Sequence, residues 1–351
     1  MTIARLAALD GLRGIAALAV ALGHCNLSVT GLDLWGRTLR DLPQMPGQEI
    51  ALRLLYVAFP SDAAVTLFFV LSGHVLWESF VRKRPSLYDG GDYLVARAYR
   101  LLPVAIASAL PLCLVRDASA LELVANMLLL GTSMNGVLWS LQVEAVCSLA
   151  IFLAWLAAGT SRVRLAALLF AVLAAAPAFR GSNFFLFFPA FLLGALIGAV
   201  PGRIWARRST LAAGLACLLL ASLVLSHGAI ARPFEMLGAA TVIACIRARP
   251  LAFLTARPVA FLGAVSYPFY LCHTFGLELA VRVEAGLNLA DPFARIAVLA
   301  LVSVPVALAL AWFLHVAVEL PAMRARPRIP GGAREPAPLA RGPAGAPLSE
   351  R

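Results

Sequence analysis

Long apolar segments alternate with short polar connections from the start of the chain to about residue 324. An α-helix needs about 20 apolar residues to cross the hydrocarbon core of a bilayer, and most of these segments approach that length. The pattern predicts ten membrane-spanning helices, over residues 8–27, 62–80, 101–115, 138–158, 163–178, 184–200, 210–226, 233–247, 259–281 and 293–318. We therefore expect an all-α fold, a polytopic membrane helix bundle of about ten transmembrane helices.

The end of the chain differs in composition from the rest. Beyond residue 324, Pro, Ala, Gly and Arg dominate, and few large apolar side chains remain. Such a segment cannot bury enough apolar surface to offset the entropy lost on ordering. We expect residues 1–324 to form one membrane domain and residues 325–351 to form a disordered cytoplasmic tail. The first apolar segment carries Asp10 and Arg13, so we expect a retained helix there and not a removable signal peptide.

The composition supports a membrane protein and decides how the charge is interpreted. Hydrophobic residues make up 61% of the chain and charged residues only 13%, whereas about a quarter of a soluble domain is charged. The net charge of +11 comes from arginines grouped between apolar segments, which is typical of membrane topology and does not indicate nucleic-acid binding. The six cysteines form no C-x-x-C pair, and we expect neither disulfides nor a metal site from them.

Alternate connections between the predicted spans carry most of the arginines. The basic residues of these connections are Arg82, Lys83, Arg84, Arg97 and Arg100; Arg162 and Arg164; Arg203, Arg207 and Arg208; Arg247, Arg249 and Arg257; and finally Arg324, Arg326 and Arg328. Because cytoplasmic loops are rich in Lys and Arg, we assign these connections to the cytoplasm, and both termini with them. The long connection at residues 28–61 is then expected to be an outward-facing loop, and loops of that length are often functional.

The first predicted span carries two ionisable residues, Arg13 and His24. They are eleven positions apart, which places them within about 20° of one helical face and about 16 Å apart along the axis. Ionisable groups at membrane depth usually mark a functional interior, so both side chains are expected to line one cavity. The alternative is an arginine that extends to the membrane surface and a histidine that only packs.

A pair of arginines in the next basic connection suggests an anion site. Arg97 and Arg100 are three residues apart on one helical face, and two guanidinium groups so placed can bind phosphate oxygens. Contact with lipid headgroups is the simpler alternative.

In the preceding span, Ser72 and Gly73 form a small-residue notch beside His74, which close helix packing explains.

Two further spans carry polar side chains at helical spacing. The fourth has Trp139 at its boundary and places Ser140 and Glu144 one turn apart, and a carboxylate there should face a polar interior. The ninth carries Tyr267, Tyr270 and His273 at intervals of three, which forms a polar wedge about 120° wide. Glu319 precedes Pro321 by two residues, and we interpret it as a helix terminus.

Six fragments together resemble the membrane acyltransferase-3 family, bacterial enzymes that transfer acyl groups to extracytoplasmic carbohydrates. They are the Arg13 to His24 spacing, FFVLSG from Phe68, RAYRLLP from Arg97, WSLQVE from Trp139, SYPFYLCH from Ser266 and VELP from Val318. They follow the family's order and cover the chain to about residue 324. His74 departs from the family, which usually has phenylalanine after the Ser-Gly pair.

The resemblance implies a multi-pass enzyme of the bacterial inner membrane. Its donor would be cytoplasmic acyl-CoA, most often acetyl-CoA, and its acceptor a hydroxyl of a glycan or glycolipid, with no metal and no nucleic acid. Membrane lipids are further partners. Some relatives carry a fused soluble domain at the C-terminus, so two alternatives stay open: a separate extracytoplasmic protein finishes the reaction, or none is needed. His24 would be catalytic, as general base or acyl carrier, with Glu144 orienting its imidazole. Arg13, Arg97 and Arg100 would bind the donor, and the pocket would include Ser72, Trp139, Ser140, Tyr267, Tyr270 and His273.

Two other classes of protein compete with this hypothesis. A proton-coupled transporter of a glycan or small solute also needs His, Glu and Arg inside a helical bundle. The sequence has no paired halves and no matching broken helices, which many transporters show. A structural or glycan-export scaffold would have no use for an arginine pair at one face and a line of imidazoles toward the other.

Overall fold

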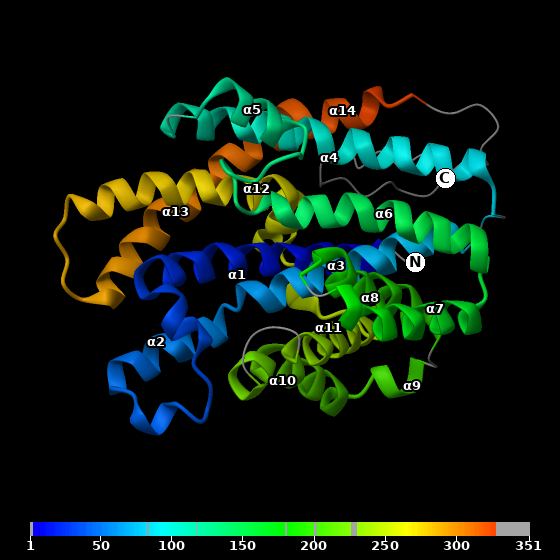
Figure 1. The fold of residues 1–351 in the computed structure, drawn as a ribbon, viewed down its shortest axis with the longest axis horizontal. Coiled ribbons are helices and arrows are strands. Elements are labelled where there is room, and N and C mark those ends of the chain that lie inside the picture. The colour runs from blue at the N-terminus through cyan, green and yellow to red at the C-terminus, as the bar shows by residue number, and fades with distance from the viewer. Residues whose placement is uncertain are drawn as a thin grey trace, which may run out of the picture.

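A computed structural model describes residues 3–81, 83, 85–116, 118–179, 181–199, 202–225 and 230–327. Within these residues the secondary structure is entirely helical. The axes of most of the long helices lie roughly along the horizontal of Figure 1. Seven helical segments of this part are long and apolar enough to cross a membrane. The predicted all-α membrane class is confirmed. The number of ten spans and the cytoplasmic positions of both termini remain predictions, and residues 328–351 of the predicted tail lie outside the described residues.

Each of the ten predicted spans overlaps one long helix. These helices are α1 (Ile3–Gly36), α3 (Ser61–Phe80), α4 (Leu87–Val115), α6 (Leu138–Ala158), α7 (Arg162–Ala175), α8 (Asn183–Leu196), α10 (Arg208–Leu225), α11 (Ala231–Ala248), α12 (Arg257–Ala285) and α13 (Pro292–Leu314). Shorter helices connect or extend them, namely α2 (Gly47–Ala58), α5 (Ala120–Met127), α9 (Gly202–Trp205) and α14 (Leu320–Ala325). A π-helical turn at His315–Glu319 joins α13 to α14.

The packing of α1 against α12 sets the register of the central part of the bundle. A Cβ atom on Gly14 would lie 2.5 Å from the backbone nitrogen of Gly263, and one on Gly263 would lie 2.6 Å from the Asp10 carbonyl oxygen. The two backbones can approach this closely only because small residues lie at the contact. His24 follows Gly14 by ten residues and His273 follows Gly263 by ten, so parallel helices in this register bring both histidines to one level.

A second close helix contact lies between α3 and α8. A Cβ atom on Gly73 would lie 2.1 Å from the Phe191 carbonyl oxygen, and one on Gly194 would lie 2.0 Å from the Val70 carbonyl oxygen. Close packing therefore accounts for Gly73, as expected from the sequence. The same contact turns Ser72, its neighbour in the chain, toward the interior beside α6.

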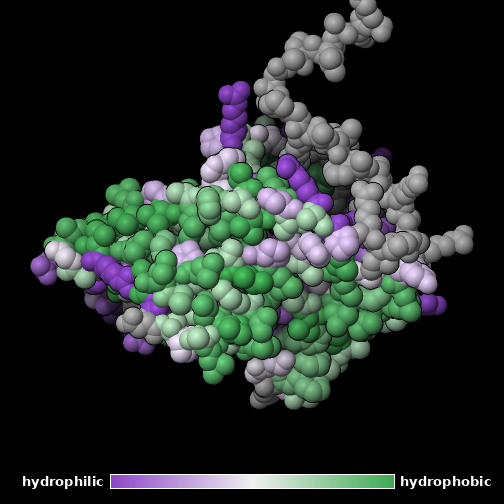
Figure 2. Space-filling view, turned by 90° about the horizontal axis from the view of Figure 1, so that it is seen from above, coloured by the Kyte–Doolittle hydropathy of each residue, from purple (hydrophilic) through white to green (hydrophobic). Residues whose placement is uncertain are grey.

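The outer surface of the bundle is rich in apolar side chains. In Figure 2 such side chains cover much of the visible face, and strongly hydrophilic ones are few, lying at the left end, along the upper edge and toward the right. On α13, Leu301 and Phe313 are 74% and 62% exposed. Exposed leucine and phenylalanine over so wide an area would be unfavourable in water, and this is the arrangement expected for a surface in contact with lipid chains.

The connection at residues 28–61, expected to be a loop, is mostly helical. The first helix continues to Gly36, with a break at Gly31 (φ 72°), and α2 follows. Arg53 of α2 is fully buried, and its Nε donates to the Arg37 carbonyl oxygen at 2.8 Å. Trp35 Nε1 donates to the Tyr56 hydroxyl at 2.6 Å. These contacts make the connection a packed helical cap, so the prediction of a loop is wrong.

Candidate active site

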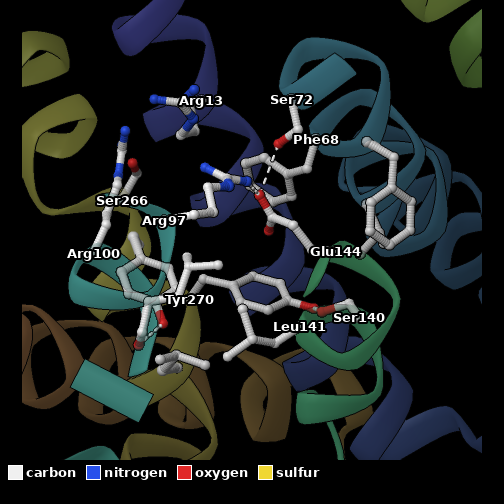
Figure 3. A pocket seen from close by; sticks show the side chains of 15 residues that line it. Arg13, Phe68, Ser72, Arg97, Arg100, Ser140, Leu141, Glu144, Ser266 and Tyr270 are labelled. Carbon is white, nitrogen blue, oxygen red and sulfur yellow. Dashed lines mark hydrogen bonds and ion pairs between the residues drawn. The ribbon is translucent and has the colours of Figure 1, made fainter. Parts of the chain in front are cut away.

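A cavity lies between α1, α3, α4, α6 and α12, with about 650 Å³ of empty space, part of it open to solvent. Figure 3 shows the side chains that surround it. They are Arg13, Val65, Phe68, Phe69, Ser72, Arg97, Arg100, Leu101, Ser140, Leu141, Glu144, Ser266, Tyr267, Tyr270 and Leu271. Eight of the eleven residues expected at the site line this cavity; the other three, His24, Trp139 and His273, do not.

The local structure of α4 places two of the cations. The Ser86 hydroxyl accepts from the Tyr88 backbone N–H at 3.2 Å and caps the helix, which therefore begins well before the predicted span at residue 101. Arg97 and Arg100 lie inside this helix, three residues apart and on one face. Both side chains point into the cavity, where Arg13 of α1 approaches them from the opposite side (Figure 3).

Positive charge exceeds negative charge in the cavity lining. The three guanidinium groups of Arg13, Arg97 and Arg100 face a single carboxylate, Glu144. Arg97 forms a hydrogen-bonded ion pair with that carboxylate. Arg13 reaches Asp10 at 3.1 Å, but the Asp10 side chain is 44% exposed and screened by solvent. Within the described part of the chain, no hydrogen bond or ion pair engages Arg100, so the lining has cationic groups left to bind an anion.

Glu144 is held by two neighbouring helices. Its Oε1 contacts Arg97 of α4 and accepts a hydrogen bond from the Ser72 hydroxyl of α3 at 2.9 Å. Arg97 in turn donates from Nε to the Ser148 hydroxyl at 3.3 Å. The sequence led us to expect that Glu144 would orient His24. In the structure its described partners are Arg97 and Ser72, because the face of α6 that carries Glu144 is turned toward α3 and α4.

Hydroxyl and aromatic groups form the opposite wall. Tyr270 and Ser140 share a hydroxyl–hydroxyl bond of 2.8 Å, and Ser140 also donates to the Val137 carbonyl oxygen at 2.8 Å. The rings of Tyr270 and Phe68 meet edge to face, with centroids 5.6 Å apart. Tyr267 donates to the Leu101 carbonyl oxygen at 2.5 Å. These bonds fix both tyrosines, so this wall is rigid.

The two predicted histidines form a pair beside the cavity. His24 Nδ1 lies 2.8 Å from His273 Nε2, and His273 Nδ1 lies 2.6 Å from the Tyr270 carbonyl oxygen. The rings are nearly parallel, with centroids 5.0 Å apart. The ring of Tyr270 is 5.7 Å from that of His273 and also lines the cavity. Tyr270 therefore connects the pair to the cavity, whereas the expectation that Arg13 and His24 line one cavity holds for Arg13 alone.

Several residues of the cavity were missed in the sequence. Val65, Phe68 and Phe69 precede Ser72 by one to two helical turns on α3, so the helical repeat from Ser72 could have identified them. Trp139 packs instead against Phe69, with ring centroids 6.1 Å apart, and so supports the wall from behind. Among the described residues, no three His, Cys, Asp or Glu side chains gather as a metal ion would require.

Glu319 is more than a helix terminus. Its side chain is 6% exposed, and its Oε2 lies 2.7 Å from His315 Nδ1 across the π-helical turn. This pair of His315 and Glu319 lies on the π-helical turn after α13, and neither residue lines the cavity.

The fold and the site together define an all-helical, multi-pass membrane protein with a cationic cavity inside its bundle. The model of the acyltransferase-3 family, described as an acyltransferase domain, matches residues 6–312. The chain belongs to this family and is a membrane acyltransferase. No curated protein and no solved structure matches it.

Proposed function

We propose that the protein transfers an acyl group, in the first instance acetyl, from cytoplasmic acyl-CoA to a hydroxyl of an extracytoplasmic or lipid-linked glycan. The observation that carries this proposal is the convergence of Arg13, Arg97 and Arg100 on one cavity beside the His24 and His273 pair. The family supplies the reaction class, acyl transfer. The donor, the acetyl group, the glycan and the bacterial inner membrane are our proposal.

The charge of the cavity supports a phosphorylated donor. CoA carries several phosphate groups, and guanidinium groups bind phosphate through charge-assisted hydrogen bonds. Three of them face one carboxylate in a cavity that opens to solvent. Arg100 has no described partner to give up, so it is the first cation available to the donor. Glu144 holds Arg97 in place, and we assign it a positioning role at the donor site.

The position of His24 supports its role as the general base. It lies on α1 eleven residues beyond Arg13, a rise of about 16 Å along the helix. A donor held by its phosphates at Arg13 can extend its thioester arm along α1 toward this histidine. His24 then takes the proton from the acceptor hydroxyl as the hydroxyl oxygen attacks the thioester carbonyl. Tyr270 and Ser140 line the cavity beside the histidine pair and would shape the path of the acyl group.

Direct measurement of donor binding and acyl transfer tests this proposal. The purified protein in lipid nanodiscs should bind acetyl-CoA in isothermal titration calorimetry and release free CoA once acceptor is added. Cells with and without the protein should differ in the acetylation of a surface glycan when that glycan is analysed by mass spectrometry. Absence of acetyl-CoA binding, together with proton-coupled solute uptake in proteoliposomes, would refute the proposal and support a transporter. Dependence of transfer on a second extracytoplasmic protein would decide between the two alternatives for a separate partner.

A further inference from the structure

The His24 and His273 pair forms a hydrogen-bond chain with a fixed direction. The chain ends at the Tyr270 carbonyl oxygen, which lies 2.6 Å from His273 Nδ1. A carbonyl oxygen can only accept a hydrogen bond, so Nδ1 of His273 carries the proton. A neutral imidazole has one ring proton, which leaves Nε2 of His273 as an acceptor. His24 Nδ1, at 2.8 Å, must therefore donate to it.

The same proton count applies to His24. Its one ring proton is on Nδ1, so its Nε2 has a free lone pair. Both rings are neutral in this arrangement, because no described carboxylate contacts either of them and an uncompensated buried charge is costly. His273 is only 2% exposed, whereas His24 keeps part of its surface accessible. The free lone pair therefore belongs to the accessible member of the pair.

We propose that His273 is a positioning residue that fixes the tautomer of His24 and makes His24 Nε2 the proton acceptor of the transfer reaction. This inference rests on the proposed function and deepens it. The packing of Gly14 against Gly263 sustains the arrangement, because it holds α1 and α12 in the register that brings the two rings level. Without this hydrogen bond, a neutral His24 could carry its proton on Nε2 instead. Nε2 would then have no free lone pair and could not accept the proton of the acceptor hydroxyl.

The proposed step balances in protons and electrons. The acceptor hydroxyl gives its proton to His24 Nε2 while its oxygen forms a bond to the thioester carbonyl carbon. Collapse of the tetrahedral intermediate breaks the carbon–sulfur bond, and the CoA thiolate takes the proton from His24 Nε2. In between, the imidazolium of His24 donates from Nδ1 to His273 Nε2, and this charge-assisted bond stabilises the cation. His273 touches neither substrate in this scheme.

Nitrogen NMR on the wild-type protein measures the tautomer directly, with a variant needed only to assign the signals. The chain has five histidines, so selective ¹⁵N-histidine labelling in lipid nanodiscs gives few signals, and a His24→Gln sample identifies those of His24. We expect a protonated Nδ1 and an unprotonated Nε2 on His24, and the same pattern on His273. A His24 ring protonated on Nε2 would overturn the inference.

Two substitutions at His273 separate positioning from packing. In His273→Gln, the side-chain amide oxygen reaches the former position of Nε2 and can accept from His24. In His273→Asn, the side chain reaches only the former position of Nδ1 and leaves His24 without its partner. We expect the Asn variant to lose at least about a hundredfold in transfer rate, because a general base contributes about 10²- to 10⁴-fold. The Gln variant should stay within about tenfold of wild type.

Controls separate this inference from the proposed function. His74→Asn removes another buried imidazole, one whose Nε2 has no partner among the described residues, and should leave transfer unchanged. Acetyl-CoA affinity should be normal in both His273 variants. An inactive wild type would refute the proposed function itself. An active wild type with equal transfer rates in the Gln and Asn variants would overturn only the role of His273.

Discussion

The ion pair between Arg97 and Glu144 allows the donor site to be tested with an internal rescue. Arg100→Ala removes one guanidinium and leaves the rest of the lining intact. Arg97→Ala removes one guanidinium and also leaves Glu144 without its ion-pair partner. If the cavity binds acyl-CoA phosphates, Arg97→Ala should weaken donor binding more than Arg100→Ala. Adding Glu144→Gln to Arg97→Ala should then restore part of the affinity.

The magnitudes follow from the contacts. Loss of one charge-assisted phosphate bond costs about 1.5 to 3 kcal/mol, so Arg100→Ala should raise the Kd roughly 10- to 150-fold. Arg97 and Glu144 have side chains only 14% and 20% exposed, so solvent screens them little. A phosphate about 8 Å from an unpaired carboxylate is repelled by about 2 kcal/mol at an effective dielectric constant of 20. Arg97→Ala should therefore lose roughly a further 30-fold, which Glu144→Gln should recover.

Calorimetric titration of acetyl-CoA into nanodisc-embedded protein measures the Kd of four variants under one salt condition. These are Arg100→Ala, Arg97→Ala, Glu144→Gln and the double variant of Arg97→Ala with Glu144→Gln. Arg164→Ala is the matched control, because Arg164 is an exposed arginine of the predicted cytoplasmic face and its loss tests for a general effect of charge. Glu144→Gln alone should not weaken binding, since the amide oxygen can still accept from Arg97 and Ser72 while the lining gains positive charge. Unchanged affinity in both Arg97→Ala and Arg100→Ala would refute the reasoning and assign these arginines to lipid headgroups.

Three further predictions concern the reaction, the topology and the packing. His24→Ala should abolish acyl transfer in a radiolabelled acetyl-CoA assay and keep the donor Kd unchanged; normal transfer would exclude it as the base. Reporter fusions after Arg208 should report cytoplasm and fusions within residues 28–61 the outside, and the reverse pattern would overturn the topology. Gly263→Val should lower the thermal unfolding midpoint measured by fluorescence-detected chromatography, because its Cβ would lie 2.6 Å from backbone. Gly286→Ala, whose Cβ would be 3.5 Å from its nearest neighbour, should leave that midpoint unchanged.

The helices could be predicted from the sequence because apolar length is a local signal. Their ends were harder to predict, since capping and packing extend them beyond the apolar segment. The predicted span 259–281 is part of α12, Arg257–Ala285, and the span 8–27 is part of α1, Ile3–Gly36. The helical cap at residues 47–58 was missed because a fully buried Arg53 contradicts the usual exposure of arginine.

The composition of the site was largely predictable, and its pairings were not. The phase of Arg97 and Arg100, or of Ser140 and Glu144, follows from 3.6 residues per turn within one helix. Which helix faces which depends on contacts between distant segments, and no local pattern encodes them. His24 therefore looked like a partner for Glu144, whereas the structure pairs it with His273, 249 positions away in the chain.

That separation along the chain has a consequence for biogenesis. The ribosome adds about 5 to 20 residues per second, so α1 is made roughly 12 to 50 seconds before its partner α12. During this interval the first helix must remain in the bilayer although it carries Asp10, Arg13 and His24. The later helices that surround these side chains in the folded protein have not yet been synthesised. The candidate active site is therefore among the last parts of the molecule to assemble, and a nascent chain interrupted before α12 has the helix that bears the proposed base but lacks His273 beside it.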